Sequence, residues 1–246
     1  MSSTIKAVLF DLGGTLIHFG VLDRKALFRR AVMRTYKRWS GCSDRMPDLR
    51  RYYRHHWYAI HWGFLKGRLL NREIDVMYLL KRASRKLWLI SPEPEDVHFR
   101  RLVLDWYEPL GRTVYLEPGT HEVLAELSRH YKLGIVSNSF IPSFVLDGHL
   151  EELGLLAYFS SRVYSCDVGY RKPDRRIFEL GMERVGSAAD GTIFVGDLLK
   201  TDVQGAERTG MRAIWKRSDG GNGESGRTVI RRITELPDVI SRLACG

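Results

Sequence analysis

The feature that most constrains the fold is an alternation of short apolar runs with longer amphipathic stretches after residue 118. An apolar run at residues 5–10 ends in Asp11 and two glycines, which is typical of a buried strand followed by a turn. Strands that alternate with helices favour a parallel sheet covered on both faces. The sequence therefore predicts an α/β fold with a Rossmann-like parallel-sheet core. The expected strands are 133–136, 162–165, 192–195 and 212–215, and the expected helices are 120–131, 142–153, 174–185 and 202–209.

Residues 21–110 have a different character. Apolar side chains recur there at helical spacing, and the clearest stripe is Leu49, Tyr53, Trp57, Ile60 and Phe64. This segment holds 20 Lys and Arg against 10 Asp and Glu, whereas the remainder of the chain holds 19 of each. We expect a helical cap domain at 21–110, inserted into a core formed by 1–20 and 111–246. Its helices are expected near 23–40, 48–66, 72–87 and 94–109.

Composition bounds the setting in which the chain works. With 44% hydrophobic and 28% charged residues the chain is typical of a soluble globular protein. No apolar run reaches the roughly 18–20 residues of a membrane span, and the N-terminus lacks the pattern of a secretory signal. Cys42, Cys166 and Cys245 are odd in number and far apart, which favours thiols over a disulfide framework or zinc site. We expect a cytoplasmic protein, without nucleic acid or membrane as partner. A flexible loop is expected at 218–226, before a last strand and helix.

Polar side chains follow the expected strands, and ligands of open α/β sheets bind at the carboxyl ends of strands. Carboxylate oxygens are ligands that Mg²⁺ prefers, and a lysine neutralises phosphoryl charge. A carboxylate can also act as a nucleophile. These residues therefore predict a site for phosphoryl chemistry. The strand-end residues are Asp11, Ser137, Asn138, Lys172, Asp197 and Asp202.

Together these residues resemble the haloacid dehalogenase superfamily, whose four motifs occur here in order. They are Phe10-Asp11-Leu12-Gly13-Gly14-Thr15-Leu16, Val136-Ser137-Asn138, Lys172-Pro173-Asp174 with Phe178, and Val195-Gly196-Asp197 through Asp202 with Gly205-Ala206. The helical insertion matches the position of the family's cap, between the first and second motifs.

The resemblance implies a role for each matching residue. Asp11 is implied as the nucleophile, with Ser137 and Lys172 as the other catalytic residues. The substrate-binding residues are Thr15, Ser137, Asn138 and Lys172. The implied Mg²⁺ ligands are Asp11, Asp197, Asp202 and the main-chain carbonyl of Gly13. The implied substrate is a small anionic, phosphorylated molecule.

The sequence departs from the family's phosphatases at Gly13, where they usually have a second aspartate that acts as acid and base. A positioned acid contributes roughly 10²–10⁴-fold in rate. Three interpretations stay open. Another group takes over the role, the leaving group needs no acid, or the reaction is not phosphate hydrolysis. His18 is a candidate substitute acid, although a loop position before the cap is the favoured interpretation of this residue.

The favoured hypothesis is a Mg²⁺-dependent phosphatase acting through an aspartyl-phosphate on Asp11. A 2-haloacid dehalogenase is an alternative. Without a cation, however, two further carboxylates beside Asp11 would repel its charge and cost desolvation energy. A non-catalytic protein that binds an anion or a partner is a second alternative. A third is single-strand nucleic-acid binding by the basic and aromatic segment 50–58, where a solvated basic helix is the favoured interpretation. His55, His56 and His61 do not share one helical face, so we expect them to be surface or packing residues.

Overall fold

The computed structural model of the chain describes residues 4–21, 23–40, 46–69, 73–87, 96–217 and 226–245. Cys42 and residues 218–225 of the expected loop lie outside this described part. The chain divides into two compact units. One comprises Met1–Phe19, Tyr115–Ser139 and Leu150–Gly246, and the other comprises Gly20–Val114 and Phe140–His149. We call them the α/β unit and the helical unit.

A six-stranded parallel sheet forms the centre of the α/β unit, with strand order β5-β4-β1-β6-β7-β8. Its strands are β1 (Ala7–Phe10), β4 (Lys132–Ser137), β5 (Phe159–Tyr164), β6 (Thr192–Gly196), β7 (Arg212–Lys216) and β8 (Thr228–Ile230). All residues of β1 and β6 are buried, as expected for strands covered on both faces. Since β1 lies between β4 and β6, Asp11 leaves the sheet at its middle.

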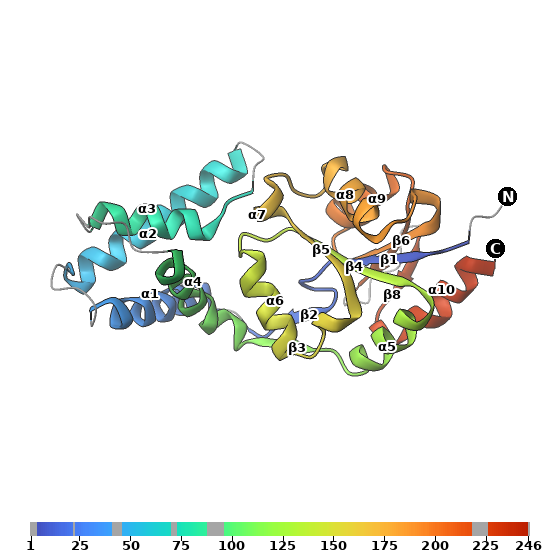
Figure 1. Cartoon of the computed structure of the whole chain (residues 1–246), viewed down its shortest axis with the longest axis horizontal. Helices are drawn as coiled ribbons and strands as arrows, with labels where there is room; N and C mark the ends of the chain where they lie inside the picture. The colour runs from blue at the N-terminus through green and yellow to red at the C-terminus, as the bar shows by residue number, and fades with distance from the viewer. Residues whose placement is uncertain are drawn as a thin grey trace. The chain divides into compact units, whose positions relative to one another are not determined.

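Helices cover both faces of this sheet, which confirms the predicted α/β fold. In Figure 1, α8 and α9 lie on one side of the strands, and α5 and α10 lie on the other. The helices and helical turns of this unit are α5 (Thr120–His130), η1 (Leu156–Tyr158), α7 (Ser165–Val168), α8 (Arg175–Val185), η2 (Ala189–Gly191), η3 (Leu199–Val203), α9 (Gln204–Glu207), η4 (Ile233–Glu235) and α10 (Leu236–Cys245).

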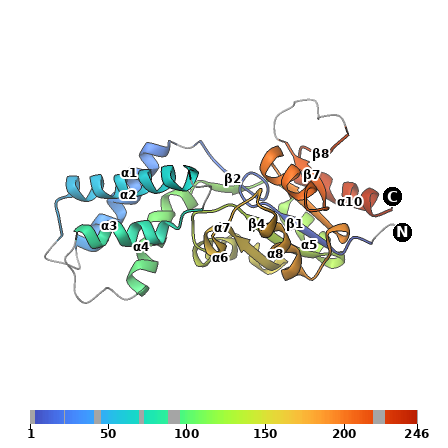
Figure 2. The ribbon, with the colours of Figure 1, turned by 90° about the horizontal axis from the view of Figure 1, so that it is seen from above.

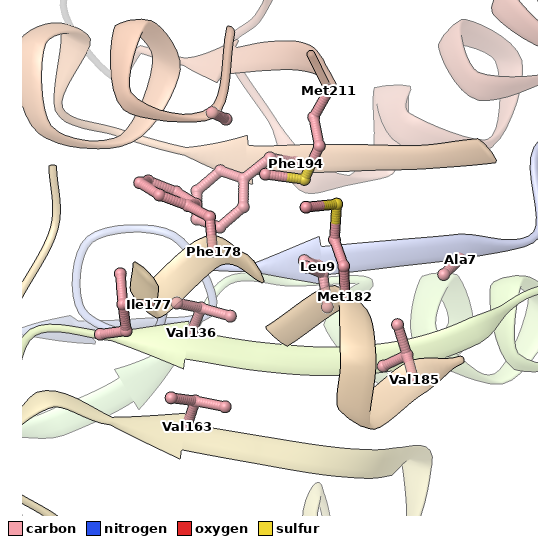
Figure 3. Packing of buried hydrophobic residues seen from close by; sticks show 11 residues of the cluster. Ala7, Leu9, Val136, Val163, Ile177, Phe178, Met182, Val185, Phe194 and Met211 are labelled. Carbon is pink, nitrogen blue, oxygen red and sulfur yellow. The ribbon is translucent and has the colours of Figure 1, made fainter. Parts of the chain in front are cut away.

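The packing of α8 on the sheet forms a continuous apolar core. Figure 3 shows Leu9 and Val136 on neighbouring strands, facing the side chains of Phe178 and Met182 from α8. The Phe178 ring meets the ring of Phe194 edge to face, with centroids 5.2 Å apart. Apolar side chains on one face of each element thus fix the height of α8 above the sheet, and with it the loop that precedes α8.

Two short strands were not predicted. β2 (Ile17–Phe19) and β3 (Val114–Leu116) form a two-stranded sheet of their own. Each has three residues, which is too short for an alternation of apolar and polar residues to stand out. The predicted helix at 202–209 also differs in form, because a π-helical turn, η3, precedes a short α9.

The helical unit contains α1 (Arg24–Ser40), α2 (Leu49–Leu69), α3 (Val76–Leu87), α4 (Asp96–Gly111) and most of α6 (Ser143–Glu152). Figure 2 shows α1 to α4 gathered as one bundle. Residues 140–149, which follow β4 in the chain, group with these helices. The Val76 amide donates to the Phe140 carbonyl at 3.1 Å, and the Phe140 ring packs against Phe64 and Trp106. Within the described residues, no helix is both long and apolar enough to cross a membrane.

Candidate active site

Asp11 is the first residue after β1, and its backbone is fixed by the neighbouring strand. Its amide donates to the Val195 carbonyl at 2.8 Å, which continues the pairing of β1 with β6 by one residue. The residue is only 7% exposed. A carboxylate at this depth has lost much of its hydration, so it needs partners within the protein.

Lys172 supplies the main partner. Its Nζ lies 2.6 Å from Oδ1 of Asp11 and 2.7 Å from Oδ1 of Asp202, and its side chain is 1% exposed. The amide group of Asn138 holds the lysine backbone in place. Its Oδ1 accepts from the Lys172 amide at 2.7 Å and its Nδ2 donates to the Lys172 carbonyl at 2.9 Å. The predicted substrate-binding residue Asn138 therefore joins the end of β4 to the loop that carries Lys172.

Two further carboxylates follow β6. Asp202 lies in η3. The Leu198 amide donates to its Oδ2 at 2.9 Å, so this side chain is directed back toward the carboxyl end of β6. A Cβ on Gly196 would lie 2.4 Å from the Cβ of Asp202, so only glycine permits this approach. On the next strand, the Trp215 indole donates to the Asp197 carbonyl at 2.9 Å and fixes the start of the same turn.

The turn after Asp11 contains Gly14 and the predicted substrate-binding residue Thr15. Gly14 has φ +87°, and a Cβ there would lie 2.5 Å from Oδ2 of Asp197, so backbone conformation and space both require glycine. Thr15 is 1% exposed, and its Oγ1 has no hydrogen-bond partner among the described residues. Ser137 ends β4 and is 4% exposed.

Burial and charge shift the ionisation of the cluster. Burial raises the pKa of Asp11, the Lys172 ammonium works against this rise, and the Asp202 carboxylate adds to it. Burial, followed by the charges of Asp11 and Asp202, raises the pKa of Asp197 to about 7. Burial works to lower the pKa of Lys172, but the Asp11 and Asp202 carboxylates outweigh it and raise that pKa. The lysine therefore stays protonated, and three carboxylates share one ammonium.

Such a cluster suits a hard cation. One carboxylate oxygen from each of Asp11, Asp197 and Asp202 lies within 4.8 Å of the other two. Oδ1 of Asp197 is buried and accepts no hydrogen bond from the described residues. An excess of buried negative charge with an unsatisfied oxygen is what a divalent cation with oxygen ligands relieves. The structure thus brings together the predicted Asp11, Lys172, Asp197 and Asp202, and Gly13 lies in the turn beside Asp11.

His18 belongs to a different cluster, which sequence reasoning missed. Its Nε2 lies 3.4 Å from Nζ of Lys216 and 3.7 Å from Oε2 of Glu117. Lys216 is 3% exposed, and its Nζ lies 2.8 Å from Oε2 of Glu117. A signal was present in the sequence, because Lys216 comes directly at the end of an expected strand, as the other site residues do.

The basic and aromatic segment 50–58 forms part of α2 in the helical unit. Tyr52 and His56 are fully buried there, whereas Trp57 and Tyr58 are 41% and 51% exposed. Between α2 and α3 this unit has a groove of about 970 Å³, lined largely by apolar and aromatic side chains. The segment is therefore partly core and partly surface, and the three histidines do not form a cluster of metal ligands among the described residues.

Comparison with known proteins gives one family. The model of one protein family, described as haloacid dehalogenase-like hydrolase, matches residues 5–210 of this chain. Glyceraldehyde 3-phosphate phosphatase of Methanothermobacter thermautotrophicus is 32% identical over 50% of this chain, which spans 58% of the length of that relative. Pyrimidine 5'-nucleotidase PynA of Streptococcus pneumoniae is 25% identical over 85% of this chain and 83% of its own. The crystal structure of a HAD phosphatase from Thermococcus onnurineus is 25% identical, with a TM-score of 0.59 over 96% of this chain and 98% of its own.

Proposed function

This chain belongs to the haloacid dehalogenase-like hydrolases, and on that premise we propose that it is a Mg²⁺-dependent phosphatase of a small phosphomonoester. The observation that supports this most is the buried Asp11 carboxylate, paired with Lys172 at 2.6 Å and grouped with Asp197 and Asp202. The phosphatase and the nucleotidase that the chain resembles act on small phosphorylated molecules by their names, which agrees with the proposal.

In the proposed reaction, a carboxylate oxygen of Asp11 attacks phosphorus and the bond to the leaving oxygen breaks. This gives an aspartyl-phosphate, which water hydrolyses in a second step. Lys172 provides a fixed positive charge for the phosphoryl oxygens. The hydroxyls of Ser137 and Thr15 are proposed to donate to these oxygens, since Oγ1 of Thr15 is buried without a partner among the described residues.

The proposed ligands of Mg²⁺ are the carboxylates of Asp11, Asp197 and Asp202, with the carbonyl of Gly13. When bound, the cation supplies positive charge that neutralises the phosphoryl group. Within the chain itself, the Leu198 amide and Lys172 keep Asp202 oriented, because each of its two carboxylate oxygens has a partner.

We further propose that the helical unit acts as the cap. Caps exclude water from a reaction and select its substrate. The segment 21–110 has 10 more basic than acidic side chains, and a positive surface attracts anions such as phosphate esters. The substrate proposed for this cap is therefore small and anionic.

The test is an assay with a panel of phosphate esters, run with Mg²⁺ and with a chelator. The wild-type protein is compared with Asp11→Asn and with Asp190→Asn as the matched control. Asp190 is exposed and precedes β6, so it lies at the opposite edge of the sheet from Asp197. We expect turnover that needs Mg²⁺, is lost in Asp11→Asn and persists in Asp190→Asn.

Two outcomes would point elsewhere. Release of halide from 2-haloacids by a folded protein that hydrolyses no ester would favour the dehalogenase alternative. An absence of turnover on both kinds of substrate, with the fold verified by circular dichroism, would favour a protein that only binds an anion or a partner.

A further inference from the structure

Hydrolysis of most phosphate esters requires a proton for the departing oxygen, and the groups around Asp11 offer few sources of it. Lys172 is shared by Asp11 and Asp202, with its Nζ at 2.6 and 2.7 Å from their carboxylate oxygens. Asp197 and Asp202 are the proposed cation ligands. Within the described α/β unit, the charged groups nearest the nucleophile are therefore already engaged.

The two glycines of the turn after Asp11 offer no acid either. Gly13 has no side chain, and a Cβ placed on it would lie 3.4 Å from Cε2 of Phe19. The space beside Gly13 thus adjoins an aromatic ring, which neither donates nor accepts a proton. Gly14 is closed to any side chain by the 2.5 Å approach of Asp197.

His18 precedes that phenylalanine and would be the obvious substitute acid. Its Nε2 faces the buried Lys216 ammonium at 3.4 Å, and an ammonium can only donate. Nε2 therefore accepts a hydrogen bond instead of donating one. Burial and the Lys216 charge lower the pKa of His18, against the effect of Glu117. A neutral imidazole held in this cluster is a poor proton donor.

We infer that this enzyme acts on phosphoryl compounds whose leaving group departs as a stable anion, such as acyl phosphates and phosphates of acidic phenols. The inference rests on the proposed function. Asp11 forms a bond to phosphorus as the bond to the leaving oxygen breaks, and the electron pair leaves with that oxygen. Water then attacks phosphorus, the bond to Asp11 breaks, and the water protons pass to phosphate and solvent.

The experiment measures kcat/KM for a series of aryl phosphates, from nitrophenyl phosphates to phenyl phosphate, together with acetyl phosphate and an alkyl phosphate. Because kcat/KM reports the steps up to phosphoryl transfer, it falls steeply as the pKa of the leaving group rises when no acid assists. We expect acetyl phosphate and the nitrophenyl phosphates to be the best substrates and the alkyl phosphate to be the worst.

The variant Gly13→Asp tests whether an added acid removes the dependence on the leaving group. A Cβ at this position would lie 3.4 Å from Cε2 of Phe19, which leaves room for it. A carboxylic acid there should raise kcat/KM for the poor leaving groups, relative to that for the good ones in the same variant, by roughly 10²–10⁴-fold. Gly13→Asn is the matched control, since it has the same size without an acidic proton. Whatever its overall rate, its kcat/KM should still fall steeply from the good to the poor leaving groups.

The outcomes separate the two proposals. A wild-type kcat/KM that barely depends on leaving-group pKa would overturn the inference and leave the phosphatase proposal standing, because it would reveal an acid. No turnover of any compound by the folded wild-type protein, acetyl phosphate included, would overturn both. If Gly13→Asp fails to fold, the slope of the wild-type series decides alone.

Discussion

Lys172 neutralises two carboxylates at once, and this makes it the residue on which the charge of the site depends most. Its contacts with Asp11 and Asp202 are short, and all three side chains are nearly inaccessible to water. A buried ion pair is weak evidence for stability as such, but the removal of one partner leaves a buried charge uncompensated. The lysine is thus important to the fold as well as to the chemistry.

We predict that Lys172→Met lowers the free energy of unfolding by about 3–5 kcal/mol in the absence of Mg²⁺, since the three carboxylates then lack an ammonium. Lys200→Met is the control, because Lys200 is exposed in the neighbouring turn η3. Urea denaturation measures both variants. A loss no greater than that of the control would contradict the description of Lys172 as the charge that balances this cluster.

The residues of the site could be predicted from sequence to the extent that each directly follows a strand. Parallel strands place their carboxyl ends at one edge, so Asp11, Ser137 and Asp197 were expected together. The double hydrogen bond of Asn138 to the Lys172 backbone was not foreseeable, because it depends on the conformation of the loop before α8. The cluster of His18 with Lys216 required knowledge of β2, which the sequence did not reveal.

Among the elements, α2 buries a different face from the one that its apolar stripe predicted. The predicted apolar stripe contains Trp57 and Phe64, which are 41% and 40% exposed. The buried side chains are instead Tyr52, His56 and Ile60, which have the same helical spacing and share only Ile60 with that stripe. Both stripes contain large rings, so spacing alone could not decide between them, and packing against α1 and α3 did. The long helices α1, α3, α4, α5 and α8 lie close to their expected positions, because long periodic segments are the clearest signals.

The burial of His56 in α2 predicts a pH dependence for the helical unit. Its Nδ1 lies 3.0 Å from the Tyr52 carbonyl, and its Nε2 has no hydrogen-bond partner among the described residues. Burial lowers the pKa of His56 from 6.5 to about 4, with a smaller contribution from His55 and an opposing one from the Tyr52 carbonyl. Between these two pH values the unfolded chain binds more protons than the folded one, so stability is full above 6.5 and falls toward 4.

From pH 6.5 to pH 4 the wild-type protein should therefore lose roughly 2–3 kcal/mol through His56. His56→Phe should lack this part of the loss, because phenylalanine does not titrate. His61→Phe is the control on the same helix, where the imidazole is exposed and stacked on Trp57. Urea denaturation at both pH values gives the comparison, and an equal loss in the two variants would refute the role of His56.

At the scale of the whole molecule, chemistry and charge are divided between the two units. The α/β unit contains every proposed metal ligand, whereas the segment 21–110 contains the whole excess of basic over acidic residues. The fold class followed from the alternation of strands and helices. The grouping of residues 140–149 with the helical unit did not, because it depends on contacts such as that of Phe140 with Phe64. Sequence patterns indicate local structure, but they do not indicate which side chains far apart in the chain come into contact.

The measurement that tests the central claim most directly is the mass of the peptide that contains Asp11. The protein is mixed briefly with Mg²⁺ and acetyl phosphate or a nitrophenyl phosphate, quenched in acid and digested. We predict one added phosphoryl group on Asp11, absent with chelator and in Asp11→Asn, and present in Asp190→Asn. Full turnover by Asp11→Asn, or a phosphoryl group on another residue, would contradict the assignment of Asp11 as the nucleophile.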